Sequence, residues 1–342
     1  MTSTITVRAD AFDPALISPE SRAFNAQLSS NTAAQSQWYQ VGIAKYRKQE
    51  EEGGAIVPVP TLVASAVAYR VPSRDPGRSV PCRLFRPQNN LVARALFMHI
   101  HGGGWVLGSE NHQDFQLQRL ADSHSIAVLS VGYRLAPEHP FPAGPQDYYD
   151  VAEWLVRNAL DRLQAPLAFI GGESAGGHLT ALTTLHLLQH PEPRYSEFRL
   201  QGLVLHYGCY SMRWLPSVHS LAKLYPHLVL SLELMSEFVK AFRGDNVPDS
   251  MLDDPRISPL YADLPSLRGK LPPALFTCGT EDYLLDDTLF MSTRWMVAGG
   301  HATVTIVNGA AHGYTNFDPN VEGSGARVGQ EATDIFLKEK LS

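Results

Sequence analysis

The sequence predicts a doubly wound α/β fold, in which a mostly parallel sheet is covered by helices on both faces. From residue 95 onward, short apolar runs with many β-branched residues alternate with longer amphipathic runs of helical period. The short runs are apolar throughout, which is typical of parallel strands buried on both faces. The chain has 342 residues, 44% of them hydrophobic, enough for one large α/β domain or two ordinary ones.

We expect six strands and six helices in this part of the chain. The strand runs are short and β-rich, and the helix runs repeat apolar residues every three to four positions. The strands are expected at 95–100, 126–133, 167–170, 203–206, 274–278 and 303–307. The helices are expected at 112–122, 146–158, 175–189, 232–243, 288–297 and 325–339.

Two regions outside this alternation are expected to form a helical cap. Residues 1–75 are polar and irregular, with helical stretches at 19–28 and 32–52. A second region, at about 208–272, separates two strands by roughly sixty residues, and such a length without structure is unusual in a compact domain. We therefore expect a catalytic domain at 76–342 that carries this second region as a cap insertion.

Composition and charge exclude several classes of protein. With 28 Lys and Arg against 34 Asp and Glu, the net charge of −6 argues against binding nucleic acid through basic residues. No stretch approaches the ~18 apolar residues of a membrane helix, and the first residues lack the apolar segment of a signal peptide. The three cysteines, Cys82, Cys209 and Cys278, are too sparse for a disulfide framework or a zinc motif. We therefore expect a cytoplasmic protein in a reducing compartment, without a membrane span.

A candidate nucleophile lies in the segment Gly172-Glu173-Ser174-Ala175-Gly176, which matches G-x-S-x-G. The motif follows a predicted strand and opens a predicted helix. A serine on such a sharp turn has an exposed hydroxyl group, and the helix N-terminus behind it favours developing negative charge. A glycine-rich turn without chemistry is the alternative, and the strand and helix on either side favour the catalytic interpretation.

A glycine-rich segment, His101-Gly102-Gly103-Gly104-Trp105, directly follows the strand at 95–100. Consecutive glycines let backbone amides approach a substrate oxygen without interference from side chains. We expect the amides of Gly103, Gly104 and Ala175 to form an oxyanion hole, and His101 to order the loop.

The general base must be chosen from thirteen histidines. In an α/β sheet the site lies at the carboxyl ends of the strands, and His312 lies just past the last predicted strand, at that end. His301 precedes the same strand and is at the wrong end. The alternatives are His206, at a strand end, His178, which we expect to be packed or to face the surface, and His99, which we expect to be a core histidine.

The orienting acid is expected to be Asp282, which follows the strand at 274–278. Its rivals are Glu281, Asp286 and Asp287, of which the last two are expected to cap a helix beginning at Thr288. The chain order serine, aspartate, histidine is that of the α/β-hydrolases.

Five sequence blocks together resemble the hormone-sensitive-lipase-like family of α/β-hydrolase esterases. They are HGGGW (101–105), YRLAPEHPFPA (133–143), GESAGGH (172–178), GTEDYLLDD (279–287) and AHGY (311–314). The resemblance implies a serine carboxylesterase with Ser174, Asp282 and His312 as its triad, the three oxyanion donors above, a helical cap, and no metal or cofactor.

This sequence departs from the family pattern at three positions. Glu173 stands where the family usually has Asp or Thr, Tyr283 where it has Pro, and Tyr314 where it has Phe. None of the three changes removes a catalytic atom.

The expected substrates are short- to medium-chain or small-metabolite esters. Bulky side chains are expected to crowd the entrance to the site: Trp105, Tyr210, Trp214 and Tyr314. An amidase, a lactonase, an acyltransferase or a non-catalytic ligand-binding module on the same residues are the alternatives. The expected partner is a small ester rather than a nucleic acid, and a homodimer is compatible with the sequence.

Overall fold

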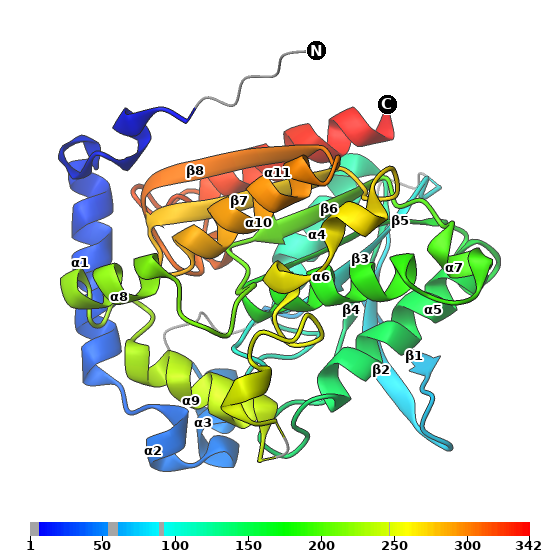
Figure 1. The fold of residues 1–342 in the computed structure, drawn as a ribbon, viewed down its shortest axis with the longest axis horizontal. Helices are drawn as coiled ribbons and strands as arrows, with labels where there is room; N and C mark the ends of the chain where they lie inside the picture. The colour runs from blue at the N-terminus through cyan, green and yellow to red at the C-terminus, as the bar shows by residue number, and fades with distance from the viewer. Residues whose placement is uncertain (1–6, 54–60, 89–91, 246) are drawn as a thin grey trace.

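The computed structural model describes residues 7–53, 61–88, 92–245 and 247–342. Within these residues one sheet has eight strands in the order β1-β2-β4-β3-β5-β6-β7-β8 (Figure 1). β2 pairs antiparallel with both β1 and β4, and all other neighbours are parallel. The strands are β1 (Val67–Pro72), β2 (Ser79–Phe85), β3 (Leu96–Ile100), β4 (Ala127–Val131), β5 (Leu167–Glu173), β6 (Gly202–His206), β7 (Ala274–Glu281) and β8 (Ala302–Ala311).

Helices cover both faces of the sheet. One face packs against α4 (Asp114–His124) and α11 (Ala326–Leu341), through a cluster that includes Phe97, Leu117 and Phe336. The other face packs against three helices that share a larger apolar cluster (Figure 1). They are α5 (Ala143–Leu163), α6 (Ala175–Leu188) and α10 (Leu285–Val297). The predicted doubly wound architecture is therefore confirmed, and every helix in the described residues is too short or too polar to cross a membrane.

The six predicted strands are present, and two further strands were not predicted. In β2 the buried residues alternate with half-buried ones, so the strand lacks the continuous apolar run of its neighbours. β1 is an edge strand that is mostly exposed. Because β1 begins at Val67, the sheet starts inside the segment 1–75 that was assigned to the cap, and that boundary was placed too late.

Within the described residues, the N-terminal segment forms two short 3₁₀ helices and three α-helices rather than the two helices predicted. The α-helices are α1 (Pro19–Ala34), α2 (Trp38–Val41) and α3 (Ile43–Glu51). Ser18 caps α1 through a hydrogen bond from the amide of Ser21, and Gly42, with a φ of +89°, separates α2 from α3. A single helix over 32–52 was therefore wrong. Residues 1–6 and 54–60 of the predicted cap segment lie outside the described residues.

The insertion contains α8 (Pro216–Leu224) and α9 (Leu232–Arg243), followed by short 3₁₀ turns. Figure 1 shows these helices beside α1, α2 and α3. The two regions are in contact, because the rings of Trp38 and Phe238 stack with centroids 5.8 Å apart. Arg47 of α3 also pairs with Glu138 of the connection that follows β4, at 2.8 Å. A short helix, α7 (Pro193–Ser196), completes the helices.

Candidate active site

Ser174 lies on a sharp turn between β5 and α6. Its φ of +56° and ψ of −118° are unusual for a residue with a side chain, and such strain is concentrated at functional sites. The turn sits directly on β3. A Cβ atom on Gly172 or Gly176 would lie 2.1 or 1.9 Å from the carbonyl oxygen of Ile100, so only glycine fits at either position.

Two hydrogen bonds connect Ser174 to His312 and His312 to Asp282. The Nε2 atom of His312 lies 2.9 Å from Ser174 Oγ, and its Nδ1 atom lies 2.8 Å from Asp282 Oδ2. The other carboxylate oxygen of Asp282 accepts a bond from the amide of Leu284, at 2.9 Å. Asp282 is fully buried, whereas Ser174 is half-buried and lines a cavity. This geometry is the one that lets a histidine remove the proton of a serine hydroxyl while a carboxylate fixes the tautomer of the imidazole.

The fold brings these three residues together because each follows the carboxyl end of a strand. Ser174 follows β5, Asp282 follows β7 and His312 follows β8, and these strands are parallel. Tyr207, just past β6, packs its ring against the His312 ring, with centroids 4.9 Å apart and planes at 66°. Tyr207 was not predicted as a site residue, although its position just after a parallel strand could have indicated it.

The competing histidines have other partners. His99 contacts Ser130 Oγ and Glu173 Oε2, each at 3.1 Å. His178 accepts a bond from the indole N–H of Trp105, and burial lowers its pKa to about 4.

Two further histidines are also occupied away from Ser174. His206 contacts Thr277 Oγ1 at 2.8 Å. The Nδ1 atom of His101 lies 2.8 Å from its neighbour's carbonyl oxygen, and burial lowers the pKa of His101 to about 3. His101 therefore fits the predicted role of ordering its loop.

The rival acids support the surrounding structure. α10 begins at Leu285 rather than Thr288, so Asp286 and Asp287 lie in its first turn and the prediction that they cap it was wrong. Asp287 instead accepts bonds from the amides of Tyr210 and Ser211, and Asp286 accepts one from Ser217. Glu281 accepts a bond from the side-chain amide of Asn25 in α1.

The glycine-rich loop after β3 has an unusual backbone. Gly103 and Gly104 have φ angles of +106° and +59°. A Cβ atom on Gly103 would lie 2.3 Å from the carbonyl oxygen of Leu107, and one on Gly104 would lie 2.5 Å from the ring of Phe238 in α9. The loop is therefore packed closely between the turn that follows it and α9, and both contacts exclude a side chain.

Glu173, one of the departures from the family pattern, holds this loop against the turn that carries Ser174. Its Oε1 atom accepts a bond from the amide of Gly102 at 2.8 Å, and its Oε2 atom lies 3.1 Å from Nε2 of His99. Burial acts to raise the pKa of this carboxyl group, but His99 and the Gly102 amide together hold it below its usual value. Glu173 is therefore a buried carboxylate that joins β3, the glycine loop and Ser174. Glu173 is part of the G-x-S-x-G motif, but its two contacts are with β3 and with the glycine-rich loop. These contacts could not be predicted from the motif alone.

A cavity of about 410 Å³ opens onto Ser174 and His312. Of the four aromatic residues predicted at its entrance, Trp105 and Trp214 line it, and Tyr210 and Tyr314 do not. Tyr314 is fully buried and donates a hydrogen bond to Thr277 Oγ1, while Tyr210 packs edge-on against Phe276. These two assignments are corrected. α9 and the residues just before it contribute apolar walls instead: Leu230, Leu234, Met235, Phe238 and Val239.

Comparison with known proteins agrees with this fold, which is that of a hydrolase. Residues 97–316 match the alpha/beta hydrolase fold family, and the chain belongs to that family. It is 31% identical over 302 residues to the carboxylic ester hydrolase LipN of Mycobacterium tuberculosis, across 84% of this chain and 73% of the relative. It is 29% identical to the ethyl acetate hydrolase of Pseudomonas putida, across 81% of this chain and 84% of the relative.

A solved structure of similar fold is also that of an esterase. The hyperthermophilic esterase of the archaeon Pyrobaculum calidifontis superimposes with a TM-score of 0.78 at 29% identity, covering 95% of this chain and 99% of that chain. The chain described here is therefore an enzyme of the carboxylesterase type, as the resemblance in sequence implied.

Proposed function

We propose that this carboxylesterase cleaves its substrates through an acyl-enzyme formed on Ser174. The observation that carries the proposal is the pair of hydrogen bonds that joins Ser174, His312 and Asp282. Ser174 Oγ attacks the ester carbonyl carbon while His312 takes its proton. His312 then protonates the leaving alcohol, and a water molecule repeats the sequence on the acyl-enzyme. Asp282 keeps the imidazole in the correct tautomer throughout.

The negative oxygen of the tetrahedral intermediate is assigned to the amides of Gly103, Gly104 and Ala175. The positive φ angles of the two glycines and the start of α6 at Ala175 support this assignment. Donors held in place before the reaction stabilise the developing charge without reorganisation, and removing one such donor lowers kcat by about 10²–10³-fold.

Replacing Asp282 with asparagine is expected to leave the fold intact and to lower kcat by up to about 10⁴-fold, because the amide favours the wrong tautomer of His312. The measurement is kcat for p-nitrophenyl butyrate, with circular dichroism to verify folding. Asp286→Asn is the matched control, since Asp286 contacts the amide of Ser217 and not His312. Equal losses in both variants would show that the wrong carboxylate has been assigned.

Glu173 is proposed to be a positioning residue for the oxyanion loop. Glu173→Ala removes the acceptor of the Gly102 amide, and we expect kcat to fall by about 10²-fold, the loss typical of a disturbed oxyanion hole, with little change in KM. Glu173→Gln retains one carbonyl oxygen and is expected to recover most of this loss. A folded Glu173→Ala enzyme with the kcat of the wild type would contradict the role.

The preferred substrates are proposed to be esters with short to medium acyl chains. We assign α1–α3 and α8–α9 to a cap, and α9 places an apolar wall over a cavity of about 410 Å³. Each added methylene contributes about 0.8 kcal/mol only while it finds apolar wall. Beyond that length an acyl chain must remain in water or displace the cap.

A series of p-nitrophenyl esters from acetate to palmitate tests this proposal. We expect kcat/KM to rise at first, reach its maximum at a short or medium chain and then fall, with no jump above the solubility limit of the substrate. A maximum at palmitate, or activation by a lipid–water interface, would contradict a closed cap.

Location and assembly are finer proposals. The three cysteines are free and buried, which supports the proposed cytoplasmic location. A homodimer is proposed from the sequence analysis alone, and light scattering of the purified chain would test it.

A further inference from the structure

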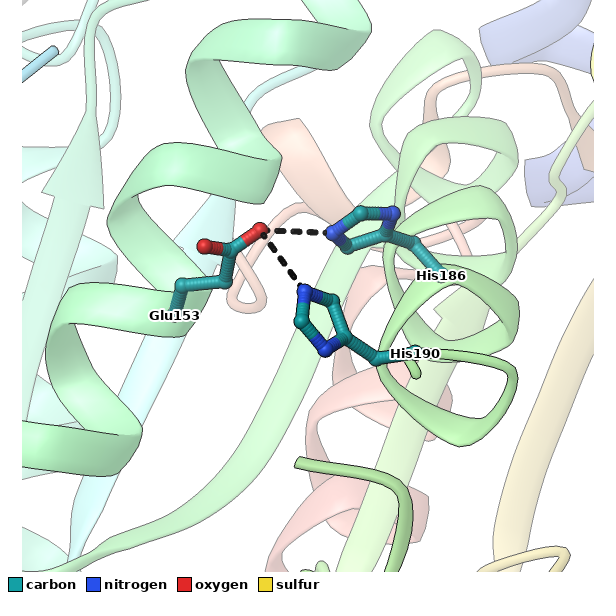
Figure 2. Close-up of side chains that lie close together, drawn as sticks. All are labelled: Glu153, His186 and His190. Atoms are coloured by element: carbon teal, nitrogen blue, oxygen red, sulfur yellow. Dashed lines mark hydrogen bonds and ion pairs between the residues drawn. The ribbon is translucent and has the colours of Figure 1, made fainter. Parts of the chain in front are cut away.

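Three side chains that commonly bind metal ions converge between α5 and α6, away from the active site (Figure 2). Glu153 lies in the middle of α5, His186 in the last turn of α6, and His190 two residues past the end of that helix. Glu153 Oε1 lies 2.8 Å from Nε2 of His186 and 3.9 Å from Nε2 of His190. All three side chains are partly exposed, so an ion can reach them from solvent.

The spacing of these atoms is close to that of a metal site. All three ligand atoms lie within 4.8 Å of one another. In a tetrahedral site with bonds of about 2.0–2.1 Å, ligand atoms are roughly 3.4 Å apart. Small rotations of the side chains would therefore bring the three atoms to bonding distance of one ion. We propose that Glu153, His186 and His190 bind a divalent transition-metal ion of the zinc type, with water as the fourth ligand.

Neighbouring aromatic rings hold both imidazoles in place. The His186 ring stacks on Tyr149, with centroids 4.0 Å apart and planes at 8°. The His190 ring packs edge-on against Tyr195, at 4.3 Å and 67°. Ligands held in this way lose less conformational entropy when they bind an ion, and this favours binding by a surface site.

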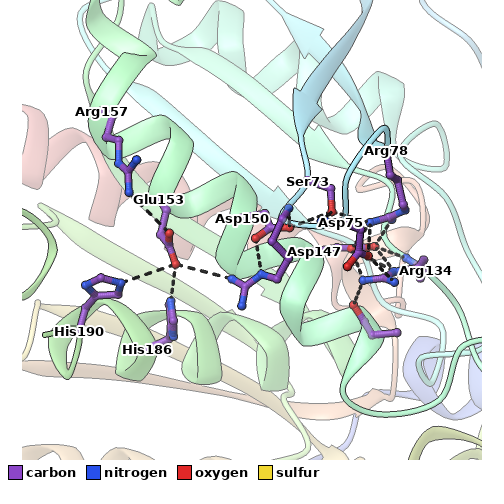
Figure 3. Close-up of polar contacts among 12 residues, drawn as sticks. Ser73, Asp75, Arg78, Arg134, Asp147, Asp150, Glu153, Arg157, His186 and His190 are labelled. Atoms are coloured by element: carbon purple, nitrogen blue, oxygen red, sulfur yellow. Dashed lines mark hydrogen bonds and ion pairs between the residues drawn. The ribbon is translucent and has the colours of Figure 1, made fainter. Parts of the chain in front are cut away.

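Two positively charged arginines near Glu153 oppose the binding of a metal ion at this site. Arg74 Nη2 lies 3.6 Å from Glu153 Oε1. Figure 3 shows Arg157 beside Glu153, and the Nη2 atom of Arg157 lies 3.9 Å from Oε2. Each arginine also has another partner. Arg74 Nε is 2.5 Å from Asp150 Oδ1, and the Arg157 guanidinium lies over the Tyr195 ring at 4.9 Å. Both can therefore stay in place when Glu153 turns to an ion, while their charge weakens its binding.

The position of the proton on the His190 imidazole also affects the binding of a metal ion. The Nδ1 atom of His190 accepts a hydrogen bond from the amide of Glu192, so the neutral ring carries its proton on Nε2, facing Glu153. An ion bound at Nε2 moves that proton to Nδ1 and breaks the bond to the amide. Glu192 is exposed, so water can replace the lost partner at little expense.

Such an ion would stabilise the fold and leave the chemistry untouched. It would join α5 to α6, and binding to the folded state alone raises the melting temperature. His186 is eleven residues past Ala175, which places it roughly 17 Å along the helix from the nucleophile turn at about 1.5 Å per residue.

Zinc titration of the EDTA-treated chain by calorimetry tests the proposal. We expect one saturable site in the wild type, and binding weakened by more than about tenfold in the double variant His186→Ala/His190→Ala and in Glu153→Gln. His301→Ala, at an exposed histidine elsewhere, is the matched control and should bind as the wild type does. Zinc should raise the Tm of the wild type and of His301→Ala only.

Esterase activity and folding provide the second readout. The EDTA-treated wild type and the double variant should hydrolyse p-nitrophenyl butyrate at the same rate, which separates this site from the proposed triad. If the alanine double variant does not fold, His186→Gln/His190→Gln takes its place. Zinc binding that is equal in the wild type and the folded double variant, or a wild type with no saturable site, would overturn the proposal.

Discussion

Ser174→Ala is expected to reduce kcat by several orders of magnitude, up to about 10⁶-fold, while the protein remains folded. Ser174 Oγ is 2.9 Å from Nε2 of His312, and no acyl-enzyme can form without it. The backbone conformation of the turn is held by glycines and by the bond from the Ser174 amide to His206, neither of which uses the hydroxyl group. The variant should therefore have the same circular dichroism and nearly the same Tm as the wild type.

The comparison is made under one set of conditions with p-nitrophenyl butyrate as substrate. Ser220→Ala is the control, because Ser220 is exposed on α8 and bonds only within that helix. It should have wild-type kcat. A folded Ser174→Ala protein that keeps more than about a thousandth of wild-type kcat would mean that another group is the nucleophile.

His312→Ala is expected to cause a loss of nearly the same size. The imidazole is the group that can take the proton of Ser174, and Asp282 on its other side cannot reach the hydroxyl group directly. Members of a triad act as one unit, so the double variant Ser174→Ala/His312→Ala should be no slower than either single variant. Losses that multiply would show that the two residues act independently.

His301→Ala is the control for this second prediction. His301 precedes β8, whereas His312 follows it, and the two lie at opposite ends of the strand. A folded His312→Ala enzyme with more than about a tenth of wild-type kcat would contradict the assignment of the base.

The sequence predicted those parts of the fold that depend on one segment at a time. The parallel strands β3 to β7 are mostly apolar and almost entirely buried, and their pattern is visible without knowledge of their neighbours. β1 and β2 are different. β1 is an edge strand and β2 lies beside it, and one side of each of these antiparallel strands is partly exposed. The break at Gly42 was missed because the residues that follow it, at 44–52, are mostly good helix formers, and one glycine lowers the stability of a helix by only about 1 kcal/mol.

The triad could be predicted because the carboxyl ends of parallel strands converge. That rule places Ser174, Asp282 and His312 together without any side-chain geometry. The rule does not say where the side chain of a residue at a buried strand end points. The contact of Glu173 with Gly102 was therefore not predicted. The rule also does not say how deeply a side chain is buried. For this reason Tyr314 was predicted at the entrance of the cavity, whereas it is fully buried in the core.

Labelling with a fluorophosphonate, followed by mass spectrometry of the peptides, tests the assignment of the nucleophile most directly. The serine oxygen attacks phosphorus, fluoride leaves and His312 takes the proton, so the reagent reports the same activation that an ester requires. We expect one adduct per chain on the peptide that contains Ser174, no adduct in Ser174→Ala, and much slower labelling in His312→Ala. An adduct on a different residue, or a catalytically active wild type that remains unlabelled, would contradict the assignment.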